Sequence, residues 1–232
     1  MRSQQFMNNR FGGVVPQFMA RSLAAMLVIF AFVMAPKAAA AQGAPDVMRL
    51  DPPQPTPDNG KVEIIEFFAY GCGHCATLEP RLNDWIKTLG PEISFRRVPV
   101  SANGFSIRGV DSAPIYYTLE AMGLLPTLHD KVFAALNNEG EALADPKVLR
   151  AWLQKNGVDA AKYEATMASF SVGVKVMQAR KLTGDYQLRS TPTLAVGGRY
   201  GVTQGTNPSP ALFFAKVGEL AAQLSASKKV AK

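Results

Sequence analysis

The chain has 232 residues, 47% of them hydrophobic, a formal net charge of +7 and two cysteines. This length and composition suit a globular protein with a sizeable core, and they exclude a small scaffold held together by several disulfides. The charge is not gathered into an arginine-rich or aromatic-interleaved stretch, so the sequence does not favour a nucleic-acid partner.

Residues 1–41 have the features of a secretory signal peptide. Three arginines precede the uncharged apolar run at 22–35, and small residues follow this run up to Ala41. The run is shorter than the about 20 residues that a spanning helix needs, which favours a removed signal over a permanent membrane anchor. Its removal takes away four basic residues and no acids, so the net charge of +7 falls to about +3.

The mature chain begins with a strand–helix–strand pattern. After a proline-rich leader at 42–60, the nearly continuous apolar run KVEIIEFFAY (61–70) predicts a strand that is buried on both faces. A helix is expected from Cys72 to Leu89, and a second strand at 92–100. Together they form a βαβ unit, whose crossover should be right-handed.

The pattern then becomes helical, from 107 to 184, and strand signals return only after it. STPTLAV (190–196), a Gly197–Gly198 turn and RYGVT predict a hairpin, and an amphipathic helix begins at Pro210. The fold class is therefore α/β, with an all-helical insertion between two α/β parts and a basic tail at the end. After the signal, the first α/β part is predicted at 42–106, the helical insertion at 107–184, the second α/β part at 185–226 and the basic tail at 227–232.

Both cysteines lie two residues apart, at the end of the predicted first strand. A purely structural disulfide there would close a loop of four residues and stabilise the fold by roughly 2 kcal/mol. A disulfide that closes a long loop contributes more than about 4 kcal/mol. A structural zinc site needs four ligands, and haem attachment needs a histidine where Ala76 stands. The spacing favours a redox-active Cys72–Cys75 disulfide, with no metal and no separate cofactor.

The redox interpretation gives the two cysteines different roles. Cys72 lies at the predicted helix N-terminus, where free backbone N–H groups and the helix dipole lower a thiol pKa. Cys75 is expected to be more buried and to act as the resolving thiol. His74 is expected to add a hydrogen-bond donor and, when protonated, a charge near the sulfur; the alternative is a solvated loop histidine.

A lowered pKa has a predictable effect on the redox potential. A fall of the Cys72 pKa from about 8.5 to about 4 favours the reduced form at pH 7 by about 4 kcal/mol. The pair then becomes more oxidising by on the order of 90 mV. We therefore expect a disulfide that is readily given away.

Three other positions bear on the site. Glu66 lies inside the apolar strand, where an acid needs a role or a partner. We expect it to accept or relay the proton of Cys75, tuned by Arg96 or Arg97; the alternative is an acid at a solvated edge of the strand. His129, on a predicted helix, is expected to be structural rather than catalytic.

Thr191 and Pro192 open the strand that returns after the helical block. A cis proline beside the cysteines would leave neighbouring backbone groups free to pair with an extended substrate chain. A trans proline at the start of the strand is the alternative.

EFFAYGCGHC, a helical block of about 80 residues and STPTLAV occur in the order typical of the thioredoxin superfamily. The chain most closely resembles the periplasmic DsbA family, over about residues 47–226. The resemblance implies a thioredoxin fold and a monomeric periplasmic dithiol oxidase that acts on unfolded exported proteins. Cys72 would form the mixed disulfide, Glu66 matches the buried acid and Pro192 the cis proline. A membrane quinone-linked protein of the DsbB type would reoxidise the pair.

Two features depart from the family pattern. Gly73 and His74 separate the cysteines, a dipeptide typical of protein disulfide isomerase, and Thr191 stands where the best-known oxidant has valine. An isomerase or reductase is therefore an alternative, and so is a non-catalytic module that binds unfolded chains. The leader at 42–60 is too short to supply the dimerisation domain of the periplasmic isomerases, which favours the oxidant.

Overall fold

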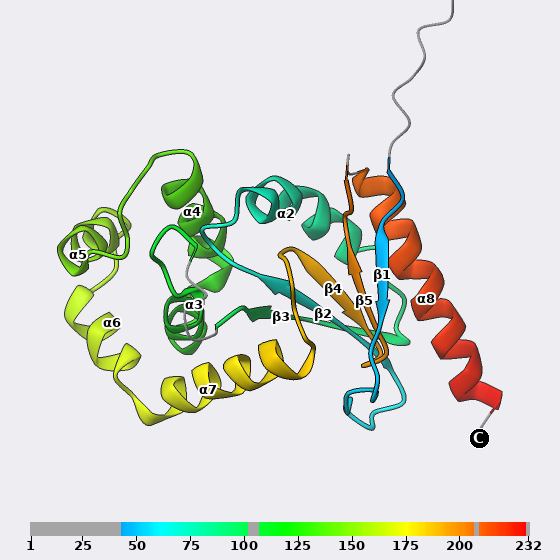
Figure 1. Cartoon of the computed structure of the whole chain (residues 1–232). Helices are drawn as coiled ribbons and strands as arrows, with labels where there is room; N and C mark the ends of the chain where they lie inside the picture. Colours follow the sequence, from blue (N-terminus) through cyan, green and yellow to red (C-terminus); the bar gives the residue numbers. More distant parts are fainter. Residues whose placement is uncertain (1–42, 102–106, 207–208, 231–232) are drawn as a thin grey trace, which may run out of the picture. The chain divides into compact units, whose positions relative to one another are not determined.

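The structure, a computed structural model, describes residues 43–101, 107–206 and 209–230. The predicted signal peptide at 1–41 and the last two residues of the predicted tail lie outside them. The described residues form an α/β fold with a mixed five-stranded sheet (Figure 1). In chain order the elements are β1 (Asp46–Arg49), β2 (Val62–Phe68), α2 (Gly73–Ile86), β3 (Ile93–Pro99), α3 (Ser112–Ala121), α4 (Leu125–Asn137), α5 (Pro146–Lys155), α6 (Ala160–Met167), α7 (Phe170–Asp185), β4 (Thr193–Val196), β5 (Tyr200–Thr203) and α8 (Pro210–Val230).

The strand order is β1-β5-β4-β2-β3. β2 runs parallel to β3 and antiparallel to β4, and all seven of its residues are buried. The prediction of a strand buried on both faces is therefore confirmed. β1 and β3 form the edges of the sheet.

Two apolar cores lie on the two faces of the sheet. Val62 and Ile64 of β2 pack in one core with Phe213 and Val217 of α8, whereas Phe67 packs in the other core with residues of the helical insertion. Figure 1 shows α8 along one side of the sheet and helices α3 to α7 on the other. The alternation along β2 places the strand between these two layers.

The amphipathic helices have recognisable starts. Asp145 accepts a hydrogen bond from Lys147 N at the start of α5, and Asp159 caps α6 in the same way. Such side chains satisfy N–H groups that have no partner inside the helix.

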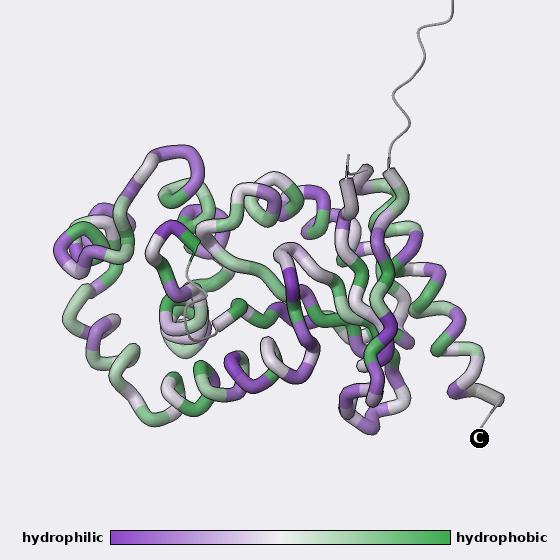
Figure 2. The backbone as a smooth tube through the Cα atoms, in the orientation of Figure 1, coloured by the Kyte–Doolittle hydropathy of each residue, from purple (hydrophilic) through white to green (hydrophobic). Residues whose placement is uncertain are grey.

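Hydrophilic and hydrophobic stretches alternate along α8 in Figure 2, as expected for a helix with one buried face.

Two helix ends differ from the sequence-based expectation. α2 ends at Ile86 rather than Leu89, because Thr88 and Leu89 bond to carbonyls only three residues back and form a turn. α8 continues to Val230 and so includes the start of the predicted tail at 227–232. Among the described residues, no helix combines the length and the apolar character needed to cross a membrane.

Candidate active site

Cys72 is the N-cap residue of α2. Its backbone is extended, with φ −83° and ψ 112°, and its Sγ accepts a hydrogen bond from the Cys75 N–H at 3.4 Å. The side chain is 7% exposed, whereas Cys75 is completely buried. Both thiols are free in the structure. The predicted difference in burial between the two cysteines is present.

Hydrogen bonds lower the pKa of Cys72 to about 5. The largest contribution to this lowering comes from the side chain of Cys75, whereas burial acts to raise the pKa. Further hydrogen bonds that lower the pKa come from the Thr191 side chain and from the backbone N–H groups of Cys75 and His74. These donors stabilise the thiolate more than the thiol. Cys72 is therefore mostly ionised at pH 7, and the direction of the pKa shift agrees with the sequence-based argument.

Cys75 is affected in the opposite direction. Burial raises its pKa well above the usual range, and the hydrogen bond to Cys72 and the charge of Cys72 raise it further. The second thiol therefore holds its proton when the first is ionised. This asymmetry suits an attacked sulfur and a resolving sulfur.

His74 lies on the first turn of α2 and is exposed. It acts on Cys72 through its backbone N–H. Its side chain lines a cavity of about 370 Å³ together with Thr191 and Pro192. Among the described residues no hydrogen bond joins the His74 ring to Cys72, so the role expected of the imidazole stays a prediction.

The Thr191–Pro192 peptide bond is cis. Thr191 O lies 3.4 Å from Cys72 Sγ, so the segment before β4 is in direct contact with the cysteine. Of the two alternatives for this proline, the structure has the cis form. The sequence therefore located both segments that meet at the thiol.

The turn before Cys72 is fixed by the helical insertion. Tyr70 N donates to Ser112 Oγ at 2.8 Å, and Asn137 Nδ2 donates to Tyr70 O at 2.8 Å. A side chain at Gly71 would overlap the Ile107 carbonyl, so glycine is required there. The insertion thus positions the N-terminus of α2.

Beneath α2 lies a buried polar cluster formed by Glu66, Glu79, Arg97, His129 and Tyr70. Arg97 is opposite Glu66 in the parallel pair β2–β3, and its Nε lies 3.0 Å from Glu66 Oε2. Arg97 Nη2 donates to Glu79 Oε1 at 2.6 Å. One guanidinium therefore lies against both carboxyl groups, and such a partner is the compensation that buried acids need.

The two acids of this cluster differ in ionisation. Burial and the neighbouring charge of Glu79 raise the pKa of Glu66 to about 8, although Arg97 opposes this rise. Burial also acts to raise the pKa of Glu79, but bonds from His129 and Arg97 outweigh it, so that pKa is lowered. Glu66 is therefore mostly neutral at pH 7, and Glu79 carries the charge that balances Arg97.

The predictions for Glu66 can be compared with these contacts. Glu66 is 1% exposed, which excludes the alternative of a solvated edge. Arg97 is its partner, whereas Arg96 pairs with Glu63 at 2.7 Å. Among the described residues no hydrogen bond joins Glu66 to Cys75, so proton transfer between them stays a prediction.

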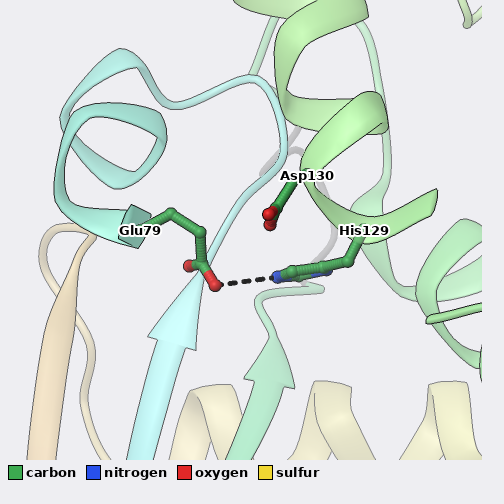
Figure 3. A group of neighbouring side chains, drawn as sticks. All are labelled: Glu79, His129 and Asp130. Carbon is green, nitrogen blue, oxygen red and sulfur yellow. Dashed lines mark ion pairs between the residues drawn. The ribbon is translucent and has the colours of Figure 1, made fainter. Parts of the chain in front are cut away.

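Glu79, His129 and Asp130 are the one group of described side chains that brings three possible metal-ligand atoms within 4.8 Å of one another (Figure 3). Glu79 Oε1 lies 3.4 Å from His129 Nε2, and His129 Nδ1 is 2.8 Å from Tyr70 Oη. Arg97 also bonds to Glu79 here, and its fixed positive charge opposes a cation. These contacts fit a role in the polar cluster better than a metal centre, and they support the structural role expected for His129.

Glu79 and Tyr70 are the members of the cluster that sequence reasoning missed. Glu79 follows Cys75 by four residues and Leu78 by one, so it lies on the buried stripe of α2. A charged residue on an apolar helix stripe is the signal that could have found it. Tyr70 lacks such a signal, because an aromatic residue fits an apolar strand end without any partner.

The residues 63–213 match the family model of the DSBA-like thioredoxin domain. The chain belongs to this DsbA-like thioredoxin family. It is 40% identical over 180 residues to the thiol:disulfide interchange protein DsbA of Bordetella parapertussis, covering 78% of this chain and 84% of the relative. Identity to the protein of the same name from Pseudomonas aeruginosa PAO1 is 33%, over 81% of this chain and 88% of the relative.

Solved structures of DsbA proteins resemble this DsbA-family chain throughout the fold. The crystal structure of Pseudomonas aeruginosa DsbA has a TM-score of 0.72 and 31% identity, covering 80% of this chain and 95% of that chain. NmDsbA1 of N. meningitidis has a TM-score of 0.67 and 27% identity. The thioredoxin-like fold and the family resemblance expected from the sequence are thus confirmed.

Proposed function

We propose that the chain is a thiol:disulfide oxidoreductase that donates its Cys72–Cys75 disulfide to reduced, unfolded exported proteins. The observation that carries this proposal is the opposite ionisation of the two thiols, with the Cys72 pKa lowered to about 5 and the Cys75 pKa raised. A thiol that is stable as an anion is a good leaving group in exchange. The names of the relatives, all thiol:disulfide interchange proteins, support the same class of reaction.

The reaction follows from these two sulfurs. A substrate thiolate attacks Cys72 Sγ of the oxidised protein, the Cys72–Cys75 bond breaks, and Cys75 leaves and takes up a proton. A second substrate thiolate then attacks the substrate sulfur of the mixed disulfide and releases Cys72 as a thiolate. The substrate loses two electrons and gains a disulfide, and the protein is left reduced. The redox group is the cysteine pair itself, as is usual for this family.

Several residues are proposed to assist. The Thr191 side chain and the His74 N–H stabilise the Cys72 thiolate, and Pro192 borders the cavity next to it. Glu66, held neutral by burial, is a proposed proton donor or acceptor for Cys75. Arg97 and Glu79 are positioning residues that set the charge state of Glu66.

The cellular setting is also a proposal. A signal at 1–41 would be removed on export to the periplasm, leaving a soluble monomer with α/β parts at 42–106 and 185–226 and a helical insertion at 107–184. A membrane quinone-linked protein of the DsbB type would reoxidise it. N-terminal sequencing of the protein from a periplasmic extract should begin at Gln42; an intact Met1 there would contradict the signal.

The oxidase proposal is tested by disulfide transfer and by equilibrium. Oxidised protein is mixed with a reduced, unfolded test protein, and the loss of thiols and the recovery of native test protein are followed. We expect stoichiometric transfer and an equilibrium with glutathione that favours the reduced protein. A potential near that of thioredoxin, about −270 mV, would rule out an oxidant and favour a reductase.

A further inference from the structure

Two adjoining cavities extend from the active site across the sheet, each of about 370 Å³. The near cavity includes His74, Thr191 and Pro192, beside Cys72. The far cavity includes Arg189 and Leu188, together with residues of β1. Asp46, Ser190 and Thr203 line both, so the two cavities form one groove with these three residues at its junction.

The position of Asp46 in this groove follows from strand register. Asp46 of edge strand β1 pairs with Thr203 of β5, and Thr203 pairs with Thr193 of β4, which directly follows Pro192. Directly paired residues share a face of the sheet. Neighbouring strands are about 4.8 Å apart, so Asp46 lies about 10 Å from Thr193 across the sheet.

This distance fixes which part of a bound substrate can reach Asp46. An extended chain advances about 3.3 Å per residue, so two or three residues span the interval. Thr191, two residues before Thr193, is in contact with Cys72 Sγ, so a cysteine bound to Cys72 lies at the β4 end of this interval. A side chain two or three positions from that cysteine could therefore reach Asp46.

The charges lining the groove are distributed unequally. Of the described residues that line the near cavity, Asp46 is the one acid, and none of them is a lysine or an arginine. Arg189 lines only the far cavity. Asp46 is exposed, and no salt bridge within 4.0 Å involves it in the part of the chain that the structure describes. Its carboxylate is thus available to a ligand in the groove.

We propose that Asp46 is a specificity-determining residue that favours unfolded segments with lysine or arginine two or three residues from the reacting cysteine. This inference rests on the proposed function, because it concerns the substrate of the same site. Asp46 acts by attracting the cation and has no part in sulfur exchange. An exposed ion pair contributes about 0.2–1 kcal/mol, which corresponds to at most about a fivefold preference.

The test uses peptides with two cysteines that differ only in having lysine, alanine or glutamate two and three positions from the first cysteine. The initial rate of disulfide transfer from the oxidised protein is measured at low and high salt. We expect the lysine peptide to react about two- to fivefold faster than the glutamate peptide, and the difference to shrink in high salt. A small uncharged disulfide compound that oxidises the same peptides serves as the reference. Asp46→Asn should reduce the lysine-to-glutamate rate ratio to the ratio measured with this compound, and Asp46→Lys should invert the ratio.

Two controls separate the possible outcomes. Asp58→Asn removes another exposed acid, which does not line the groove, and should leave the ratio unchanged. The rate ratio measured with the small uncharged disulfide gives the effect of lysine on the reactivity of the peptide thiol itself. If the alanine peptide is oxidised but the lysine-to-glutamate ratio is the same in wild type and Asp46→Asn, the specificity role is wrong and the proposed function stands. If no peptide is oxidised, both fail.

Discussion

The first turn of α2 and the buried polar cluster beneath the same helix handle negative charge in different ways. At Cys72, uncharged hydrogen-bond donors from Cys75, Thr191 and the backbone lower the pKa to about 5. In the cluster, Arg97 pairs with both Glu66 and Glu79, and only Glu79 stays readily ionised. Charge at the reactive sulfur thus depends on local geometry, whereas charge in the cluster depends on ion pairing. The two regions should respond differently to the same kind of substitution.

The largest expected effect is loss of activity in Cys72→Ser. Serine is a good N-cap, so the fold and the binding of unfolded chains should survive, while disulfide transfer to a reduced test protein should vanish. The matched variant Cys75→Ser has no disulfide to donate either, but its Cys72 thiolate should attack oxidised glutathione, release one glutathione thiolate and keep the other glutathione as a mixed disulfide that is visible by mass spectrometry. Residual transfer in Cys72→Ser would place the reactive sulfur elsewhere.

The next effect distinguishes the two acids of the cluster. Glu79→Gln leaves the partly buried Arg97 without its main counter-charge and should lower the free energy of unfolding by about 3 kcal/mol. Glu66→Gln should not lower it at pH 7 and should raise it, because the folded protein holds Glu66 mostly neutral while the unfolded chain ionises it, a cost that glutamine avoids. Denaturant unfolding of both variants gives the comparison. Equal losses would show that the two acids are charged alike.

The pH dependence of Glu66→Gln sharpens the same point. The folded pKa of Glu66, about 8, is above the ordinary value of 4.5. The stability that comes from this raised pKa is fully present below pH about 4.5 and is lost as pH rises through about 8. Glutamine does not titrate, so the variant should gain stability relative to wild type from pH 5 to 8. A constant difference would exclude the raised pKa.

The contribution of Cys72 to stability depends on pH in the opposite direction to that of Glu66, and it exists only in the reduced protein. Its folded pKa, about 5, is depressed, so its contribution to the reduced form is present above the unfolded pKa and disappears as pH falls through about 5. Between pH 4 and 7 the reduced form should gain about 2 kcal/mol over the oxidised form, after allowance for solvent screening. Thermal melts at both pH values measure this gain, with a higher melting temperature for the reduced form at pH 7.

The smallest effect is expected for Thr191→Val. Valine removes one side-chain hydrogen bond to Cys72 and keeps the shape, so the Cys72 pKa should rise by less than about one unit. The potential should become less oxidising by on the order of 20 mV. A fall of the pKa in this variant would show that the threonine does not stabilise the thiolate.

The sequence predicted those features that follow from local pattern. The continuous apolar run of β2, the cysteine spacing at the start of α2 and the Thr191–Pro192 segment each have a signal within a few residues. The pairing of Glu66 with Arg97 rather than Arg96 could not be predicted, because it depends on the register of β2 against β3. The junction of the groove at Asp46 depends on pairing across three strands, which no local pattern specifies.

The central claim is that an uncharged hydrogen-bond network keeps Cys72 ionised in the reduced protein. Titration of the thiolate by its ultraviolet absorbance tests this most directly, with Cys72→Ser as the blank. We predict a transition with a pKa near 5 that is absent from Cys72→Ser. A transition near the value of a free cysteine, about 8.5, would contradict the account.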